Sequence, residues 1–211
     1  MKQAAFTKNA PDKPRNGDYF SIIEHNSGAI IAVLADGSGS SPCDWKAAEI
    51  AVTVFETAIL KVEEIDKAEV AKCVAAAAKE VSDMYGLCAG ARSSMAVAAV
   101  GNDGAYWLVN LGRSSIFHYN GSDLLEQISG QKTCFLGEKL PQMVVLEGRL
   151  NRNEGIVLLS RGVVEHSGRA FLPDFRYLFS KANPDKNLPL LMEKYVPGQV
   201  EDMTALFVVF E

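Results

Sequence analysis

The chain has 211 residues, of which 48% are hydrophobic and 22% are charged, a balance typical of a globular protein with an ordinary apolar core. The net charge is −5 and the basic residues do not cluster, which argues against nucleic acid or an anionic membrane as a partner. Residues 1–8 lack the apolar core of a signal peptide, and the longest apolar run, 29–35, is too short to span a bilayer. These features predict a cytoplasmic protein with a single domain over residues 1–211.

The four cysteines are far apart in the sequence, form no Cys-x-x-Cys pair and have no histidine nearby at zinc-ligand spacing. In a cytoplasmic chain this pattern favours reduced, mostly buried thiols. We therefore predict four free cysteines, namely Cys43, Cys73, Cys88 and Cys134.

The first predicted elements are two β-prone runs, 19–25 and 29–35, joined by Asn-Ser-Gly at 26–28. Because Asn and Gly adopt positive φ readily, this pattern predicts a tight hairpin. Residues 36–42 then interrupt the pattern, and from Asp44 the apolar residues recur at helical spacing. Asp44 is the candidate N-cap of this helix.

A second, alanine-rich helix is predicted from residue 66 to about 85, before Gly86 ends it. Over residues 95–128 the pattern becomes short strands separated by turns, which predicts an antiparallel meander. Strands and helices come in blocks, so the sequence favours an α+β fold of antiparallel sheets covered by helices. The expected strands are 95–100, 106–111, 115–119, 124–128, 144–150, 156–160 and 205–210, and the expected later helices are 173–181 and 188–195.

Several short motifs lie at the ends of these predicted elements or between them. KPRNGD at 13–18 leads into a strand and is similar to an Arg-x-x-Asn-Glu/Gly-Asp pattern, and ADGSG at 35–39 contains an Asp-Gly-x-Gly turn. NLGRS at 110–114 is similar to Asn-x-Gly-Asp-Ser and is followed by a Leu-Gly segment at 133–137. The last pair is LLSRG at 158–162, similar to Leu-Leu-Ser-Asp-Gly, and EDMT at 201–204, similar to Asp-Asn/Asp-x-Thr.

In their order and spacing, these motifs resemble the signatures of the metal-dependent PPM-type (type 2C) serine/threonine phosphatases and their bacterial sporulation and stress-response relatives. The resemblance implies a four-layer αββα sandwich, with two antiparallel sheets packed face to face and helices on both outer sides. It also implies hydrolysis of phosphoserine or phosphothreonine by a water that Mn²⁺ or Mg²⁺ activates. A phosphoprotein would then be the substrate or signalling partner.

The resemblance assigns metal-binding and catalytic roles to acidic residues at strand ends. Asp36 would bridge the metal ions and the Gly37 carbonyl would bind one of them, while Asp18 and Glu201 would be further ligands; Asp36 and Asp18 are the candidate catalytic residues. The glycines after Asp36 would let the backbone approach a cation closely. The alternatives are an ordinary strand-to-helix turn at Asp36 and a solvated strand edge at Asp18.

Several positions depart from the family pattern. Arg113 and Arg161 stand where the family has aspartates, and each change alters the local charge by two units; a pair of unit charges 4 Å apart interacts by roughly 4 kcal/mol at an effective dielectric of about 20. A second divalent ion should therefore bind poorly, leaving one ion or none. Lys13 lies near the family's phosphate-gripping arginine, so Lys13, Arg113 and Arg161 are the candidate phosphate-binding residues. The alternatives are a solvated Lys13 and a salt bridge from Arg161 to Asp36 or Glu201.

Two functions follow from these motifs and departures. The chain is either a phosphoprotein phosphatase, or a pseudophosphatase that keeps the fold as a non-catalytic protein-binding module. In both cases we predict that four residues distant in sequence converge at one end of the sandwich, with the other carboxylates of the set within about 10 Å of Asp36. They are Asp18, Asp36, Arg161 and Glu201.

Overall fold

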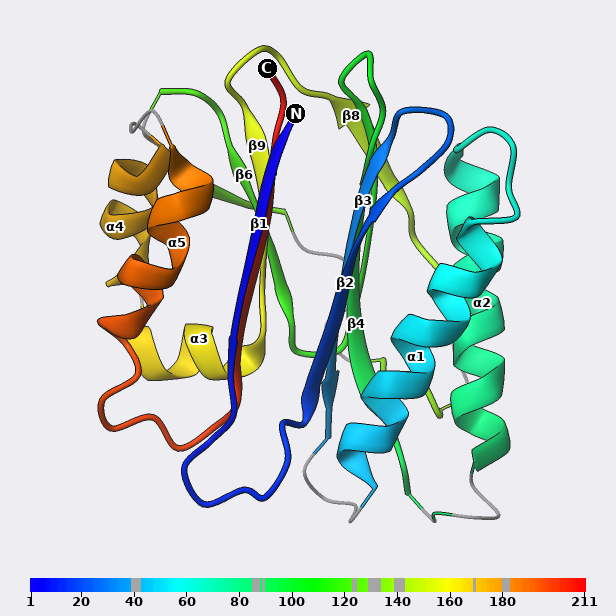
Figure 1. Cartoon of the computed structure of the whole chain (residues 1–211). Coiled ribbons are helices and arrows are strands. Elements are labelled where there is room, and N and C mark those ends of the chain that lie inside the picture. The colour runs from blue at the N-terminus through cyan, green and yellow to red at the C-terminus, as the bar shows by residue number, and fades with distance from the viewer. Residues whose placement is uncertain are drawn as a thin grey trace.

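The computed structural model describes residues 1–38, 43–84, 88, 90–122, 125–128, 134–138, 143–168, 170–179 and 183–211. Two antiparallel sheets pack face to face at the centre, and helices cover both outer faces (Figure 1). This is the α+β, four-layer αββα sandwich that the sequence predicts. None of the described helices combines the length and the apolar character that crossing a bilayer demands.

Each sheet contains five strands in the described part of the chain. In spatial order the first sheet consists of β1 (Lys2–Lys8), β10 (Met203–Val209), β9 (Gly155–Leu159), β6 (Ser115–Tyr119) and β7 (Leu125–Ile128). The second sheet consists of β2 (Asp18–Glu24), β3 (Ile30–Gly37), β4 (Ser93–Val100), β5 (Ala105–Leu111) and β8 (Leu146–Arg149). Helices α3 (Arg161–Ser167), α4 (Phe171–Phe179) and α5 (Pro184–Glu193) cover the first sheet, and α1 (Asp44–Ile59) and α2 (Lys67–Asp83) cover the second (Figure 1).

Three apolar layers hold the sandwich together, and strand β3 shows how the sequence builds them. Ile31 and Val33 of β3 pack in the layer beneath α1 and α2, whereas Ala32 and Leu34 pack in the layer between the sheets. Because both faces of this strand are covered, its sequence is a continuous apolar run without polar alternation. The third layer lies between the first sheet and its helices, with Phe171, Phe175 and Phe207 among its members.

The predicted β2–β3 hairpin is confirmed. The two strands pair in antiparallel register, and Gly28 in the connection has φ 83°, in the region that favours glycine. The register places Asp18 directly opposite Asp36. Since directly opposite residues project from the same face of a sheet, the hairpin alone brings two acidic side chains together.

The predicted meander over residues 95–128 is wrong at its midpoint. Strands β4 and β5 pair as expected, but β6 crosses to the other sheet and pairs with β9 and β7. The crossing occurs at Gly112, whose φ is 80° and where a side chain would meet Ser94. Crossing lets Ile116 of β6 enter the apolar layer between the two sheets.

Other sequence-based boundaries shift by a few residues, and two elements were not predicted: strand β1 and helix α3. Asp44 is the first residue of α1 rather than its N-cap, which is Cys43. The Asp44 carboxylate instead accepts a hydrogen bond from the backbone N–H of Trp45 at 2.7 Å. The predicted end of α2 near residue 85 lies outside the described residues.

The prediction that all four cysteines are free is also wrong. Cys43 and Cys88 form a disulfide across 45 positions of sequence, with their Cα atoms 6.3 Å apart. Cys73 and Cys134 are thiols outside this disulfide, as predicted. The pair escaped sequence analysis because the spacing of two cysteines says nothing about their distance once intervening helices fold back on each other.

Candidate functional site

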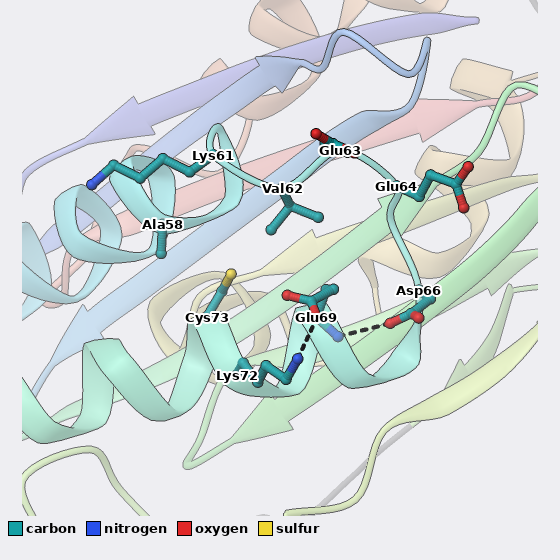
Figure 2. Close-up of a pocket in the computed structure, with 9 residues that line it drawn as sticks. All are labelled: Ala58, Lys61, Val62, Glu63, Glu64, Asp66, Glu69, Lys72 and Cys73. Atoms are coloured by element: carbon teal, nitrogen blue, oxygen red, sulfur yellow. Dashed lines mark hydrogen bonds and ion pairs between the residues drawn. The ribbon is translucent and has the colours of Figure 1, made fainter.

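A groove of about 820 Å³ opens where α1 meets α2, at the far end of α1 from Asp36 (Figure 2). Two of the acidic residues on its rim are already engaged: Glu69 pairs with Lys72, and Asp66 accepts a hydrogen bond from the N–H of Glu69 at 2.8 Å. Burial raises the pKa of the Cys73 thiol at its floor to about 11, so this thiol is neutral at physiological pH. None of the sequence motifs lines this groove.

The motif residues meet instead at one end of the sandwich, where several chain segments end or begin. Asp18 is the first residue of β2, and Asp36 is the last but one of β3. Arg161 is the first residue of α3, and Glu201 precedes β10. Arg161 donates its backbone N–H to the Asp36 carboxylate at 3.4 Å, and its guanidinium contacts Glu201. The predicted convergence of these four residues is therefore confirmed.

Asp36 carries a perturbed carboxyl group. Burial raises its pKa to about 6, an effect that the positive charge and the backbone N–H of Arg161 partly offset. Glu201 adds to the rise by like-charge repulsion. Asp36 is therefore ionised at neutral pH but gains a proton under mildly acidic conditions.

Asp18 is the more unusual carboxyl group because it is buried and neither of its oxygens has a hydrogen-bond partner among the described residues. Burial and the charge of Asp36 raise its pKa well above the ordinary value. The hydroxyls of Thr204 and Ser160 lie close enough to oppose this rise, but both are engaged elsewhere. Ser160 Oγ donates to the Asp202 carbonyl at 3.5 Å and accepts from the Thr204 N–H at 2.9 Å, and Thr204 Oγ1 pairs with Thr7 Oγ1 at 2.8 Å.

Arg161 occupies the position of a carboxylate in the resembled motif and forms an ion pair with another motif residue. Its Nη2 lies 2.8 Å from Oε1 of Glu201, and its side chain is only 20% exposed. Lys13 Nζ approaches the other Glu201 oxygen at 3.8 Å. Glu201 is thus already neutralised by cations of the chain itself, which is the salt-bridge alternative raised by the sequence.

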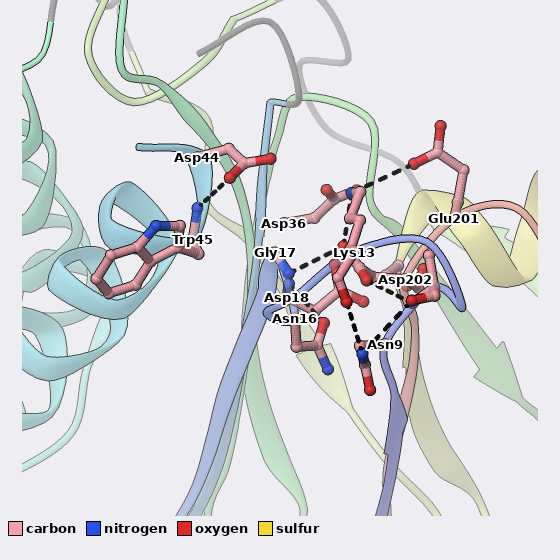
Figure 3. Close-up of polar contacts among 12 residues, drawn as sticks. Asn9, Lys13, Asn16, Gly17, Asp18, Asp36, Asp44, Trp45, Glu201 and Asp202 are labelled. Atoms are coloured by element: carbon pink, nitrogen blue, oxygen red, sulfur yellow. Dashed lines mark hydrogen bonds and ion pairs between the residues drawn. The ribbon is translucent and has the colours of Figure 1, made fainter. Parts of the chain in front are cut away.

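Lys13 belongs to a second ion pair, with Asp202, which the sequence analysis did not single out (Figure 3). The buried Asp202 carboxylate accepts hydrogen bonds from Lys13 Nζ at 2.7 Å, from the Gly17 N–H at 2.9 Å and from the Ala10 N–H at 2.8 Å. Although burial opposes the charged form of Lys13, the hydrogen bond and charge of Asp202 raise its pKa. Lys13 is therefore held inward as a counter-ion rather than solvated.

Arg113 completes the predicted set and lies near Asp36 without an ion-pair partner among the described residues. Its guanidinium is 5.9 Å from the ring centre of Phe135, and the residue is exposed. It borders a small cavity of about 10 Å³, room for about one water. This cavity also touches Asp36, Gly37, Ser38, Ser94 and Arg161.

Two glycines let backbone segments pack tightly around the site. A side chain on Gly37 would overlap the carbonyl group of Asp44, so the first turn of α1 lies directly against the Asp36–Gly37 turn. A side chain on Gly162 would overlap the carbonyl oxygen of Asp202 in the same way. The motif glycines therefore have a packing role here, while Gly39 lies outside the described residues.

The donor set does not fit a pair of divalent ions. Among the described residues, no group of three or more histidine, cysteine, aspartate or glutamate side chains is arranged to hold a metal ion. Glu201 is bound to Arg161 and Asp202 to Lys13, which leaves the Asp18 and Asp36 carboxylates, with the Gly37 carbonyl, as donors. Hard divalent cations in proteins take about six oxygen ligands, and a two-ion centre needs more carboxylates than these.

The role of Asp202 was missed because its partners are backbone groups of a loop close to 190 positions away, and sequence patterns do not report such contacts. The signal that was available is an aspartate directly after Glu201, at a position where the resembled motif has Asn or Asp. A buried acid there needs donors, and the loop with Lys13 supplies them.

No protein-family model matches the sequence, and no curated protein matches it. Among solved structures, the Streptococcus agalactiae serine/threonine phosphatase aligns over 100% of this chain and 99% of its own, with TM-score 0.83 and 16% identity. The Mycobacterium tuberculosis serine/threonine phosphatase PstP aligns over 100% and 98%, with TM-score 0.83 and 14% identity. The catalytic domain of PstP has also been solved with 2 manganese ions, and it matches with TM-score 0.83 and 15% identity over 100% and 98%.

A chain from the bacterial stressosome, a modular system adapted to control secondary messenger signalling, aligns over 97% of both chains with TM-score 0.73 and 16% identity. All these identities are low, so the likeness concerns the fold and not the chemistry. The near-complete coverage in both directions means that the whole sandwich is shared. The chain therefore has the fold of the PPM-type serine/threonine phosphatases.

Proposed function

We propose that this chain is a pseudophosphatase, a protein with the PPM phosphatase fold that acts as a non-catalytic protein-binding module. The observation that carries the proposal is the Arg161–Glu201 ion pair at 2.8 Å, with the backbone of Arg161 on Asp36. In the resembled motif both positions are metal-binding carboxylates. A guanidinium that already satisfies one carboxylate repels an incoming divalent ion.

The charge balance of the site supports the same proposal. Lys13 and Arg161 together offset Glu201 and Asp202, while burial and the charge of Asp36 raise the pKa of Asp18 and so favour its neutral form. The Asp36 carboxylate, which has no ion-pair partner among the described residues, accepts the N–H of Arg161. The chain thus compensates most of its own buried charge without a bound cation.

For the partner, we propose a phosphoprotein or another protein of a phosphorylation-based signalling system. The fold shared with serine/threonine phosphatases and with a stressosome chain supports this class of partner. Lys13 and Arg161 are engaged in internal ion pairs, so they are poorly placed to hold a phosphate. Arg113, exposed beside the small cavity, is the proposed contact for an acidic or phosphorylated group.

A second candidate function is a weak phosphatase that uses a single metal ion. The observation that favours it is the Asp18–Asp36 pair, in which Asp18 has two buried oxygens without hydrogen-bond partners among the described residues. A cation between these carboxylates would give the buried Asp18 oxygens a partner and would reduce the repulsion between the two negative charges. In this case Arg161 would act as a phosphate clamp.

The two candidates are separated by measuring hydrolysis of p-nitrophenyl phosphate and of a phosphothreonine peptide with Mn²⁺ for the wild type and for Arg161→Asp. As a pseudophosphatase, the wild type should stay at background and bind no Mn²⁺ by calorimetry, whereas Arg161→Asp should bind Mn²⁺. Brisk Mn²⁺-dependent turnover in the wild type, reduced by Arg161→Asp, would instead establish the phosphatase.

Arg152→Asp is the matched control because it makes the same charge reversal at an exposed turn before β9, away from the site. It should leave Mn²⁺ binding and turnover at the wild-type level. A gain of Mn²⁺ affinity in both variants would mean that the net charge of the protein, rather than the Arg161 position, governs metal binding.

A further inference from the structure

The Cys43–Cys88 disulfide ties together two segments that flank the candidate site. Cys43 is the N-cap of α1, and Cys88 follows the end of α2, so the bond closes a loop that contains both helices. Neither cysteine belongs to a sequence motif, and the phosphatase-like site does not use them.

On the Cys43 side, the bond holds the first turn of α1 against two loops of the site. Asp44 lies so close to Gly37 that a side chain on this glycine would overlap its carbonyl group. The guanidinium of Arg15, in the loop that leads into β2, lies 4.2 Å from the ring centre of Trp45. The start of α1 therefore touches the loops on which both Asp18 and Asp36 depend.

On the Cys88 side, the chain runs directly to a contact with the same turn. The Cys88 carbonyl accepts a hydrogen bond from the Ala91 N–H at 3.0 Å. Next to Ala91, the Arg92 carbonyl accepts from the Ser38 N–H at 2.9 Å, and Arg92 Nε donates to Ser38 Oγ at 3.1 Å. Ser38 follows Gly37 and borders the small cavity at Asp36. The two segments joined by the disulfide thus hold the Gly37–Ser38 turn from two sides.

We propose that Cys43 and Cys88 form a reversible thiol–disulfide switch that sets the position of the first turn of α1 and, through it, the shape of the cavity at Asp36. In the oxidised protein the start of α1 is fixed against Gly37. In the reduced protein this end of α1 is held only by noncovalent contacts and moves away more readily. This switch operates whether or not the site hydrolyses phosphate.

The redox step is an ordinary thiol–disulfide exchange with a dithiol reductant. A thiolate of the reductant attacks Cys43 Sγ, which is only half-buried, and the Cys43–Cys88 bond breaks as Cys88 leaves and takes up a proton. The second reductant thiolate then displaces Cys43. The two cysteines gain two electrons and two protons in total, and the dithiol becomes a disulfide.

Cys73 does not compete for this role. It is buried, and its raised pKa, about 11, keeps it in the unreactive thiol form.

The test uses the full chain with Trp107→Phe, which leaves Trp45 as its only tryptophan. Oxidised and dithiothreitol-reduced samples are compared by Trp45 fluorescence and by the rate of tryptic cleavage after Lys46, with free thiols counted by alkylation and mass spectrometry. Reduction should add two free thiols, shift Trp45 emission to longer wavelength and speed cleavage after Lys46. Reoxidation should restore all three readings.

The variant Cys43→Ser/Cys88→Ser should show the Trp45 emission and the cleavage rate of the reduced protein, with or without dithiothreitol. Wild type that has been reduced and alkylated should show the same two values without any substitution. Identical Trp45 emission and cleavage in the oxidised and reduced proteins would overturn the proposal. So would free Cys43 and Cys88 thiols in the oxidised sample. Unfolding on reduction, seen by far-UV circular dichroism, would also overturn it, since the bond would then be a structural staple and not a switch.

Discussion

Lys13 Nζ lies 2.7 Å from Asp202 Oδ2, although 189 positions of sequence separate the two residues. The same carboxylate accepts the backbone N–H groups of Ala10 and Gly17. The loop before β2, which leads to Asp18, is therefore fastened to the strand end that carries Glu201. This contact sets where the two halves of the candidate site stand relative to each other.

We expect Asp202→Asn to lower the free energy of unfolding by about 2 kcal/mol, because an amide replaces one accepting oxygen with a donor that faces other donors. Urea denaturation measures this loss. Asp12→Asn, at an exposed position in the same loop, is the control and should stay within about 0.5 kcal/mol of the wild type. Equal stability of the two variants would show that the Asp202 contacts do not fasten the loop.

A second prediction concerns Asp18→Asn. Burial and the charge of Asp36 raise the pKa of Asp18, so the folded protein holds a proton that the unfolded chain, with a pKa of about 3.9, releases. The stability linked to this group is full below about pH 4 and falls as the pH rises toward the folded pKa. Asp36, whose pKa is raised to about 6, adds to this fall between about pH 4 and 6.

Since Asn is neutral at every pH, Asp18→Asn should raise the melting temperature at pH 7 and flatten its dependence on pH above about pH 4. Thermal unfolding between pH 4 and 8 measures both effects. Asp12→Asn should retain the wild-type slope. A variant that is less stable than the wild type at pH 7 would mean that the Asp18 carboxylate is stabilised by something other than a proton.

A third prediction follows the metal-binding capacity of the site through stepwise substitution. Arg161→Asp removes the cation beside Glu201 and adds an oxygen ligand, so we expect Mn²⁺ binding, undetectable by calorimetry in the wild type, to become measurable, with an affinity higher by about a hundredfold or more. Adding Glu201→Asp shortens the side chain by one methylene and should tighten binding further by restoring the reach of the resembled motif. Calorimetry with Mn²⁺ follows each step.

Arg113→Asp is the last step of this series, because Arg113 borders the same cavity as Asp36. If Mn²⁺ affinity stays at the wild-type level through all three substitutions, charge at these positions is not what prevents metal binding. Removal of the Mn²⁺ with a chelator should return the stability of each variant to its metal-free value.

A fourth prediction tests the packing of α1 on the Asp36–Gly37 turn. Gly37→Ala should lower the free energy of unfolding by about 2–3 kcal/mol, because the new methyl group would overlap the Asp44 carbonyl. Gly101→Ala is the matched control, since a methyl group there would meet mainly the movable end of the Asp103 side chain. Equal losses in urea denaturation would mean that glycine flexibility, and not close packing, matters at Gly37.

Local patterns predicted much of the site, because Asp18 and Asp36 belong to one hairpin. The apolar run of β3 and the turn with Gly28 set the pairing of β2 with β3, and pairing at once places the two acids opposite each other. The convergence of Arg161 and Glu201 on this pair was predicted only through the family resemblance. The sequence left Arg161 either as a phosphate-binding residue or as the partner of a salt bridge to Asp36 or Glu201. The structure shows the ion pair with Glu201.

The missed features depend on distant parts of the chain. Strand β1 has few β-branched residues and is a strand because it pairs along its whole length with β10. Helix α3 is only seven residues long and starts directly after β9. The side chain of its N-cap, Ser160, makes no capping hydrogen bond, so the start of the helix lacks the usual sequence signal. The Asp202 contacts and the Cys43–Cys88 bond likewise join segments that only the folded topology brings together.

None of the candidate site residues belongs to the three apolar layers that hold the sandwich together. The shape of the protein and the chemistry at its rim are therefore specified by separate sets of residues. Replacing Asp18, whose buried oxygens have no hydrogen-bond partner among the described residues, removes a carboxyl group whose burial is unfavourable, and it leaves the layers intact. In a fold of this kind, substitutions at the rim can remove catalytic residues one at a time while the apolar layers keep the overall shape. The surface that contacts a binding partner can therefore persist after catalysis is lost.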